Sequence, residues 1–309
     1  SDMLMFNAEE AGIVVKFEKK DTPQKVNIKL FRQGPKDIRL NDTKISQKEL
    51  IGTLNTVIFC PEDLQLIKGT PSGRRRFLDM EISQTSATYY HQLMQYNRLL
   101  QQRNAVLKEY RGKNTIPLEE WDLQLADMAS FIVKKRLESL KKINLLIDLM
   151  NRKLTGGLEN LTIGYEQPYM DNGSLEYTKE GFYERIKAAL PQDRHRLSTS
   201  VGPHRDDLRF FSDAMDLKKF GSQGQQRTAV LSLKLSELEF IKSEVGEYPV
   251  LLLDDVLSEL DESRRTNLLQ FIHKRIQTFI TTTDIHDFKD LKSVQFISCE
   301  GGQVQYGQP

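Results

Sequence analysis

Residues 249–261 read PVLLLDDVLSELD, and this stretch decides the fold. Four apolar residues in a row, Val250 to Leu253, predict a central strand that is buried on both faces. The carboxyl end of that strand brings Asp254 and Asp255 to the rim of a sheet, where open α/β sheets bind ligands. One carboxylate there can hold a Mg²⁺ shared with nucleotide phosphates, and its neighbour can orient or deprotonate an attacking water. The alternative is a buried strand that ends in two solvated acids.

A glycine- and serine-rich helix start precedes this strand. Residues 218–240 read KKFGSQGQQRTAVLSLKLSELEF, and their apolar spacing predicts a helix from Gln223 to about Val245. Gly221 and Gly224 permit close backbone approach, while the free N–H groups of the helix start and the Ser222 hydroxyl favour an anion. The alternative is an ordinary helix capped by serine. The order of the two features, helix start and then acidic strand, favours a nucleotide site.

The flanking regions complete an α/β pattern. Residues 12–32 predict two strands with a turn at Asp21-Thr22-Pro23, and Asn55–Phe59 predicts a short buried strand. After the acidic strand, a helix is expected from about Glu262 to Arg275, followed by a strand within QTFITTTD, residues 277–284. Strand, helix and strand in this order favour a crossover connection and a parallel sheet.

The middle of the chain is predicted to be helical. Apolar side chains in residues 85–110 recur at spacings of three, four and seven, typical of one helix face, with an interruption near residues 103–104. A turn at 111–117 leads to a second long helix over 118–154, which the glycines at 156–157 end. The two helices should form an antiparallel α-hairpin, either packed in a bundle or projecting as an arm.

Composition limits the class of protein. The 309 residues include 44 Lys plus Arg, 43 Asp plus Glu, 39% hydrophobic and 28% charged residues, which is too apolar for disorder and too polar for a membrane protein. The length favours about two domains. Cys60 and Cys299 are the only cysteines, which argues against a disulfide framework or a cysteine zinc site and fits a reducing cytoplasm. A net charge of +1 neither supports nor excludes a nucleic-acid partner.

Three short motifs resemble those of ABC-type ATPases. Ser222–Gln226 resembles the signature motif, Leu251–Asp255 the Walker B strand and Ser258–Asp261 the D-loop. Within that superfamily the chain is similar to the RecF family of SMC-related recombination-mediator ATPases. The stretches that carry this similarity are PEDLQLIKGTPSGRRRFLD (61–79), VGPHRDDL (201–208), the signature and LLLDDVLSELDESRRTNLL (251–269).

The resemblance implies a fold class and a division of the chain into three segments. We expect an α/β fold, a P-loop NTPase head of the ABC/SMC type with an inserted α-helical hairpin lobe. Residues 1–73 would form the β-rich part of ATPase lobe I, and 74–198 the helical arm or lobe II. Residues 199–309 would hold the signature helix, Walker B, the D-loop and the end of the ATPase lobe.

The resemblance also implies ATP and Mg²⁺ as cofactors, with roles for named residues. Asp254 would hold Mg²⁺, and Asp255 would activate the attacking water. Thr283 takes the place of the switch histidine of transporters, and because threonine exchanges no proton near neutral pH, slow hydrolysis is expected. A nucleotide held by a second copy would meet the signature and D-loop residues Ser222, Gln223, Gly224, Gln225 and Asp261.

An ATPase of this superfamily is expected to contain a phosphate-binding loop, and this sequence contains none. Such a loop needs G-x-x-x-x-G-K-[ST], and the only Gly-Lys pair is Gly112-Lys113, followed by Asn114. We therefore expect a chain that resembles a family member without its first, Walker A segment and that hydrolyses no ATP by itself. The Q-loop region, Pro61-Glu62-Asp63, has no glutamine.

DNA and protein partners follow from the resemblance as well. The family implies an ATP-dependent homodimer that clamps double-stranded and gapped DNA and acts with RecO and RecR to load RecA, with no membrane partner and a cytoplasmic, nucleoid-associated location. The densest basic run is Arg74, Arg75 and Arg76, for which DNA contact and structural ion pairing are both open. The cations of residues 134–142 are expected on a solvated helix face. His204 is expected to be a packed histidine bonded to a neighbouring aspartate.

Two other functions compete with this interpretation. A transporter ATPase subunit shares the signature and Walker B motifs, but the long helical insertion and Thr283 in place of histidine disfavour it. A non-catalytic DNA-binding or scaffold module is the second alternative, because a chain without a phosphate-binding loop need not turn over ATP.

Overall fold

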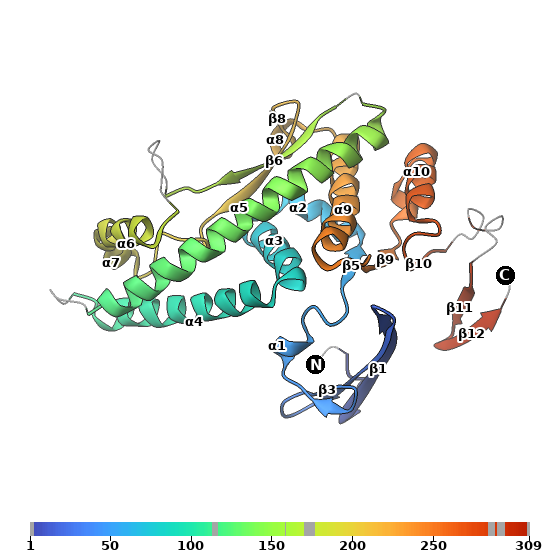
Figure 1. The fold of residues 1–309 in the computed structure, drawn as a ribbon, viewed down its shortest axis with the longest axis horizontal. Coiled ribbons are helices and arrows are strands. Elements are labelled where there is room, and N and C mark those ends of the chain that lie inside the picture. The colour runs from blue at the N-terminus through green and yellow to red at the C-terminus, as the bar shows by residue number, and fades with distance from the viewer. Residues whose placement is uncertain are drawn as a thin grey trace.

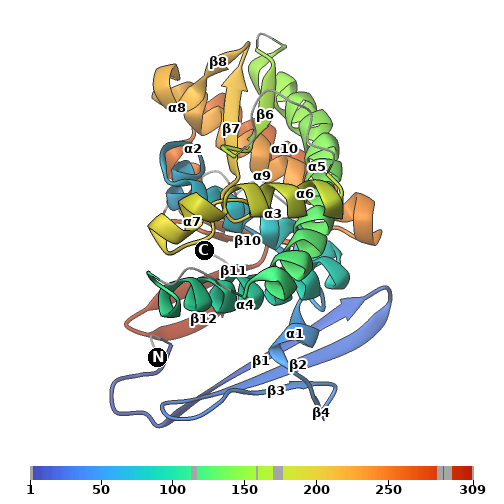
Figure 2. The ribbon, with the colours of Figure 1, turned by 90° about the vertical axis from the view of Figure 1, so that its left-hand side faces the viewer.

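The computed structural model describes residues 3–112, 117–157, 159–169, 177–283, 288 and 294–307. Helices gather on one side of the molecule, and an antiparallel sheet forms a separate layer beneath α4 (Ala87–Glu109) (Figures 1 and 2). No helix of the described residues is long and apolar enough to cross a membrane.

The N-terminal layer is a four-stranded antiparallel sheet in the order β1-β2-β3-β4. The two strands predicted in residues 12–32 are confirmed, although the turn lies one residue earlier than expected. Lys20 and Asp21 form it with φ angles of 48° and 59°, and Pro23 already lies in the second strand. The strands are β1 (Glu10–Lys19), β2 (Thr22–Phe31), β3 (Asp37–Leu40) and β4 (Thr43–Lys44).

The second sheet is parallel and carries the acidic strand at its centre, in the order β10-β9-β5. The prediction of a strand–helix–strand unit is confirmed, with the helix ending at Ile272, before the predicted Arg275. Its elements are β5 (Thr56–Phe59), β9 (Val250–Asp254), α10 (Glu262–Ile272) and β10 (Thr278–Thr281), with the 3₁₀ turns η1 (Pro61–Leu64) and η2 (Leu257–Glu259).

The predicted helical hairpin is present and is preceded by a further helix. α3 (Pro71–Thr85) and α4 (Ala87–Glu109) meet at Ser86, and α5 (Glu119–Thr155) runs back along α4. The predicted glycine stop is confirmed, because Gly156 adopts φ 69° at the C-cap of α5. Part of the predicted turn at 111–117 lies outside the described residues.

The interruption of the apolar face near residues 103–104 does not break the helix, because α4 runs through it. Arg103 is fully buried rather than solvated. Its Nε donates to Asp122 Oδ1 and its Nη1 to Asp193 Oδ2, both at 2.6 Å. Partners on other helices therefore allow a charged residue on a packed helix face.

The remaining elements close the helical lobe around the signature helix. A sheet in the order β6-β7-β8 lies beside α3, α5 and α8. The predicted helix of residues 223–245 is α9, with these bounds. The other elements are α1 (Gln47–Leu50), α2 (Gln65–Lys68), β6 (Leu161–Glu166), α6 (Lys179–Ala188), α7 (Leu190–Arg196), β7 (Asp207–Ser212), β8 (Met215–Asp216), α8 (Leu217–Phe220), β11 (Phe296–Glu300) and β12 (Gln303–Gly307).

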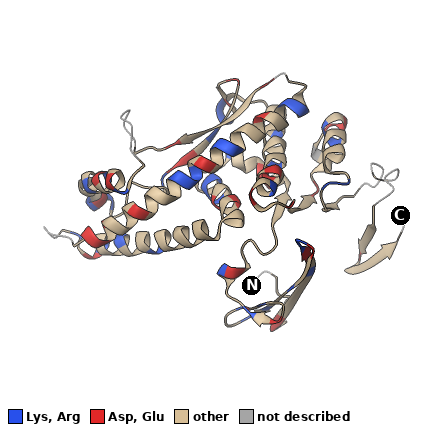
Figure 3. Cartoon of the chain, in the orientation of Figure 1, with Lys and Arg blue, Asp and Glu red and all other residues tan. Residues whose placement is uncertain are grey.

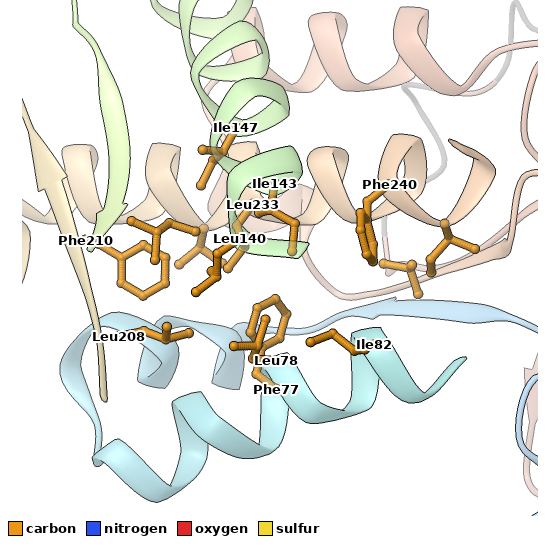
Figure 4. Close-up of a cluster of buried hydrophobic side chains, with 14 of the residues drawn as sticks. Phe77, Leu78, Ile82, Leu140, Ile143, Ile147, Leu208, Phe210, Leu233 and Phe240 are labelled. Carbon is orange, nitrogen blue, oxygen red and sulfur yellow. The ribbon is translucent and has the colours of Figure 1, made fainter. Parts of the chain in front are cut away.

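The core joins α3, α5, α9 and β7, and its side chains point toward one another in Figure 4. Each large apolar side chain buried here contributes roughly 1.5–3 kcal/mol relative to exposure. Because α5 packs against α4, α6 and α9, the hairpin is a packed lobe over these contacts rather than a free arm. The labelled core residues are Phe77, Leu78, Ile82, Leu140, Ile143, Ile147, Leu208, Phe210, Leu233 and Phe240.

Candidate functional site

Asp254 lies at the carboxyl-end edge of the parallel sheet, as the apolar run predicts. It is the last residue of β9, and its side chain is exposed. The parallel register places Thr281 of β10 opposite it. The Thr281 hydroxyl donates to Asp254 Oδ1 at 2.6 Å, so a neighbouring strand orients the carboxylate while this bond leaves its Oδ2 unengaged.

The backbone turns sharply at the next residue, Asp255. Its φ is 52°, in the left-handed region that aspartate tolerates better than most non-glycine residues. Its N–H donates to Thr281 Oγ1 at 3.1 Å, and Ser258 Oγ donates to its carbonyl oxygen at 2.8 Å. Two adjacent carboxylates are thus held at one edge in different backbone conformations, which suits them to different roles.

The donor atoms at this edge fit a hard cation that is shared with phosphate. Oxygen atoms of Asp254, Asp255 and Thr281 are the protein groups available. In the part of the chain that the structure describes, no group of three or more His, Cys, Asp or Glu side chains could hold a metal ion by itself. Mg²⁺ commonly takes one or two carboxylates and completes its octahedron with waters and phosphate oxygens, so this edge suits Mg²⁺ bound with a nucleotide.

Thr283 reaches the same edge of the sheet. It follows β10, and its side chain is exposed. Because the carboxyl ends of parallel strands meet at one edge, the structure brings the predicted residues Asp254, Asp255 and Thr283 to one side of the sheet. Asp284, at the end of the predicted strand, lies outside the described residues.

Ser222 caps α9 and stays exposed. Its Oγ accepts the Gln225 N–H at 3.2 Å, and Gln225 Oε1 accepts the Ser222 N–H at 3.0 Å, which completes a capping box. The ordinary cap anticipated from the sequence is therefore present. Gln223 and Gly224 are exposed as well, and the backbone beside them is open to a ligand. Gly221 is required for packing, since a Cβ there would lie 2.7 Å from the Leu217 carbonyl oxygen.

Asp261 begins the helix that follows the acidic strand. Its Oδ1 accepts the Arg264 N–H at 2.9 Å, and its carboxylate forms an ion pair with the Arg264 guanidinium. The hydrogen bond from the Arg264 backbone lowers the pKa of the Asp261 carboxyl, which therefore stays ionised. The structure thus places this residue as the exposed N-cap of α10.

The predicted residues form two groups, one at the start of α9 and one at the sheet edge. α8 leads into Ser222 and contacts α9. Arg227 and Val230 of α9 line a small pocket together with Val256, which follows the sheet edge. The sheet edge thus lies beside the first half of α9, and Ser222 and Asp254 are both exposed.

The arginine triplet divides into three environments. Arg74 is buried and donates from Nε and Nη2 to the two carboxylate oxygens of Asp207, at 2.7 and 2.8 Å. Arg75 is half-buried and donates from Nη1 to the Asp206 carbonyl oxygen at 2.6 Å. Arg76 is exposed. Structural ion pairing thus accounts for Arg74, and DNA contact stays a prediction for the rest of the triplet.

His204 does not bond an aspartate, contrary to expectation. Its Nδ1 lies 2.6 Å from the Tyr96 hydroxyl, and its Nε2 lies 3.0 Å from the Thr199 carbonyl oxygen. Burial lowers the pKa of His204 to about 4, and the neighbouring arginines add to that effect. The close approach needs Gly202, where φ is 129° and a Cβ would lie 2.3 Å from the Tyr96 oxygen. The histidine is a packed, neutral residue.

The cations of residues 134–142 do not all lie on a solvated face. Lys134 and Lys141 are exposed, but Arg136 is fully buried. Its Nη2 lies 2.9 Å from Asp79 Oδ1, and its Nη1 donates to the Pro203 carbonyl oxygen at 2.7 Å. Sequence reasoning missed this role because its partners come from α3 and from the loop before β7.

A second buried charge cluster joins the η1 turn to the signature helix. Lys234 of α9 lies 3.3 Å from Glu237 Oε2 and 3.4 Å from Asp63 Oδ1. Glu81 of α3 is buried close by, and burial raises its pKa to about 7 although Lys234 opposes the shift. Three carboxylates thus surround one ammonium group. The only signal in the sequence was the acidic pair in Pro61-Glu62-Asp63.

The N-terminal sheet carries a basic face that sequence reasoning also missed. The register places Lys16 directly opposite Lys25, and like charges in such positions destabilise a sheet. Lys25 pairs with Asp42, and Arg39 and Lys44 pair with Asp37, which lies opposite Lys29 on the same face. Among the described residues, the ammonium groups of Lys16 and Lys29 have no hydrogen-bond or ion-pair partner within 4 Å. An anion over this face would remove the repulsion. Alternation in KVNIK (25–29) was the available signal, and the basic sheet face consists of Lys16, Lys25, Lys29, Arg39 and Lys44.

Comparisons with known proteins point to one family. A protein of Alkaliphilus oremlandii described as DNA replication and repair protein RecF is 46% identical over 294 residues, which cover 94% of this chain and 80% of the relative. A solved structure described as the recombination mediator protein RecF with ATP in the RecFOR pathway matches with a TM-score of 0.90 and 34% identity, over 99% of this chain and 82% of that chain. No family model matches the chain.

A more distant structure shows likeness in fold alone. The Smc head domain with a coiled coil and joint from Pyrococcus yayanosii matches with a TM-score of 0.53 and 11% identity, over 97% of this chain and 82% of that chain. The predicted fold, an ABC/SMC-type ATPase head with an inserted helical lobe, is confirmed. These comparisons lend no support to the transporter alternative.

Proposed function

The chain belongs to the RecF family of DNA replication and repair proteins, and from this premise we propose that it acts as an ATP-dependent, dimerising DNA clamp. Two copies would close around two nucleotides and hold double-stranded or gapped DNA. RecO and RecR would then help the clamp to load RecA at gaps. The similarity to RecF with ATP in the RecFOR pathway supports the nucleotide and the partners.

The sheet edge at Asp254 would hold Mg²⁺ and the phosphates of ATP. Its exposed carboxylate, oriented by the Thr281 hydroxyl, fits a cation that keeps phosphate oxygens as further ligands. When bound, Mg²⁺ would neutralise charge on the phosphates. Asp255 would accept the proton of the attacking water. Thr283 can donate a hydrogen bond to phosphate but exchanges no proton near neutral pH, which favours slow hydrolysis that resets the clamp.

The exposure of Ser222 and Asp254 is the observation that carries the dimer. Both residues have the chemistry of a nucleotide site, and both side chains are open to a second molecule. Ser222 of one copy would then meet the phosphates that Asp254 of the other copy holds. Two copies related by a twofold axis would form two such composite sites with the same pair of surfaces.

DNA contact is assigned to the basic sheet face. Lys16 and Lys29 form no ion pair among the described residues, although Asp37 lies opposite Lys29. Lys25 and Arg39 lie on the same face and pair with Asp42 and Asp37. Cations at strand spacing can contact phosphates without reading bases, which suits a clamp that holds DNA of any sequence.

A mixing experiment tests the composite site. In a form of the protein that binds ATP, Ser222→Ala and Asp254→Asn chains should each hydrolyse ATP poorly. An equal mixture should regain about a quarter of the wild-type rate, since half of the random dimers are mixed and each holds one intact site of two. Ser243→Ala, near the other end of α9, is the matched control and should keep the wild-type rate.

The outcomes separate the proposal from its alternatives. A mixture that stays as inactive as its components would place Ser222 and Asp254 in independent sites and overturn the composite arrangement. A protein that binds DNA equally with and without ATP, in every variant, would favour the scaffold function.

A further inference from the structure

A cavity of 680 Å³ lies between α3 and α4, away from the sheet edge and the signature helix start. One face of α3 forms one wall, and one face of α4 forms the other. Arg136, Pro203 and His204 contribute to the lining from α5 and from the loop before β7. We call this feature the α3–α4 groove. Its volume falls in the range of pockets that bind ligands.

The wall near the α3–α4 junction is apolar and adaptable. Met80 and Met94 line it with exposed fractions of 52% and 41%, and Tyr90 and Leu93 lie beside them. Exposed methionines in a concave site are unusual for a surface that meets only water, and their flexible thioethers suit a surface that adapts to apolar side chains. Figure 3 shows that α4 carries few charged residues over this length.

The other end of the groove is cationic. Arg75 and Arg76 line it where α3 begins, and the first turn of α3 holds no acidic residue to offset the helix dipole. Burial and the nearby Arg136 lower the pKa of Arg75, as expected for a cation without a carboxylate in contact. Asp79, the carboxylate that lines the groove, is already paired with Arg136 at 2.9 Å.

We propose that the α3–α4 groove is a docking site for a peptide segment of a partner protein that carries an apolar anchor beside one or more carboxylates. The apolar side chain would pack between Met80 and Met94, and the carboxylates would meet Arg75 and Arg76. A nucleic-acid strand fits less well, because a polyanion needs cations along its whole path and here they lie at one end only. This site goes beyond the proposed clamp, and for Arg75 and Arg76 it replaces the predicted DNA contact with a peptide carboxylate.

Peptide selection tests the groove with the 309-residue chain. A phage-displayed library of random peptides is selected on the wild-type protein, and synthetic copies of the enriched peptides are measured by fluorescence anisotropy. We expect sequences that combine Leu, Ile, Phe or Met with Asp or Glu. Arg76→Glu and Met94→Glu should each weaken their binding at least about tenfold, as for a central contact. In ¹³C-methyl methionine spectra, the peptides should shift the signals of Met80 and Met94.

Matched controls keep the result interpretable. Arg98→Glu on α4 and Leu145→Glu on α5, where Leu145 is 71% exposed, lie outside the groove and should bind the peptides normally. All four side chains are exposed, so the melting temperatures should match that of the wild type. Selected peptides that lack acids, or that bind Arg76→Glu as well as wild type, would overturn the proposal. Displacement of the peptides by an oligothymidylate strand would assign the groove to nucleic acid instead.

Discussion

Arg74 and Asp207 lie 133 residues apart in sequence and form a two-pronged ion pair in the interior. Arg74 Nε and Nη2 donate to Asp207 Oδ1 and Oδ2 at 2.7 and 2.8 Å, and Nη1 donates to the Gly69 carbonyl oxygen at 2.9 Å. The pair joins α3 to β7 beneath the surface. Arg74, which the sequence analysis named as a candidate DNA contact, is therefore a buried residue that stabilises the fold.

Arg74→Ala should therefore destabilise the protein. Removing one partner of a buried ion pair leaves the other uncompensated, which typically costs about 3–5 kcal/mol. Because 18% of the Asp207 side chain is exposed, the loss should lie at the lower end of that range. Thermal and urea unfolding measure it, and Arg76→Ala is the exposed neighbour that should change stability by less than about 0.5 kcal/mol. An Arg74→Ala protein of normal stability with a reduced salt dependence of DNA binding would restore Arg74 to the DNA surface.

The basic sheet face makes a quantitative prediction for DNA binding. Lys16→Gln with Lys29→Gln should weaken binding to duplexes of any sequence and reduce the log–log salt slope by about 1.8, or about 0.9 for each phosphate that is no longer neutralised. Folding should be unaffected or slightly improved, because the repulsion between Lys16 and Lys25 is relieved. The double variant Lys134→Gln, Lys141→Gln on α5 removes the same charge from another surface. If both double variants lowered the salt slope equally, net charge alone would explain the result and the basic sheet face would not be the DNA contact.

Substitutions of Asp254 and Asp255 at the sheet edge should have different effects, one on nucleotide binding and the other on hydrolysis. In a form of the protein that binds ATP, Asp254→Asn should weaken binding of Mg²⁺ with ATP, because the carboxylate that Thr281 orients is lost. Asp255→Asn should leave binding intact and slow hydrolysis, because an amide cannot accept the proton of water. Equilibrium binding and single-turnover hydrolysis give the two readouts. The same binding defect in both variants would contradict this division of roles.

Ser222→Arg should block assembly and spare the monomer. In an ATP-binding form of the protein, nucleotide should still bind, since the phosphates would be held at Asp254 and the exposed Ser222 would act only from a second copy. ATP-driven dimerisation should be abolished, because a bulky cation would fill the space for the phosphates held by the second copy. Sedimentation velocity with ATP measures this. Ser222→Ala loses the helix cap, at about 1 kcal/mol, without adding bulk, and is the control for the cap. An undiminished Ser222→Arg dimer would refute contact across copies.

The buried charge cluster predicts a change in stability with pH. The folded-state pKa of Glu81 is raised from 4.5 to about 7, chiefly by burial, so the folded chain keeps a proton that the unfolded chain has lost. Stability should therefore fall as pH rises from about 4.5 to 7, and Glu81→Gln should remove that part of the slope. His204 has the opposite sign, because its folded-state pKa is lowered to about 4. Its contribution is lost as pH falls from about 6.5 to 4.

Chemical denaturation across pH 4–8 separates these two groups. Glu81→Gln should lessen the decline toward neutral pH, which Glu237 shares because burial raises its pKa as well, and should leave the acid side as it is. His204→Gln should flatten the acid side and leave the neutral side as it is, although loss of the bonds to Tyr96 and Thr199 lowers the whole curve. A wild-type curve that neither variant changes in shape would contradict both assignments.

Local pattern was sufficient where each residue's role depends on its neighbours in sequence. The α9 bounds of Gln223–Val245 were predicted because apolar residues recur at helical spacing over this stretch. Asp254 and Asp255 were placed at the sheet edge because an apolar run predicts a buried strand and its polar end must leave the core. The turn at Lys20 and Asp21 was missed by one residue, since both adopt positive φ without a glycine to mark them.

Only the tertiary structure decided which charged side chains are buried and which are exposed. Arg74, Arg103 and Arg136 appear in the sequence as surface cations, yet each is buried against carboxylates from distant segments. A buried charge is tolerated only when partners surround it, and those partners arrive through the packing of α3, α5 and β7. Sequence by itself determined the strand, the helix and the two acids, because hydrophobic period and caps act over a few residues. The basic sheet face and the α3–α4 groove required the fold, because only packing brings residues tens of positions apart to one surface.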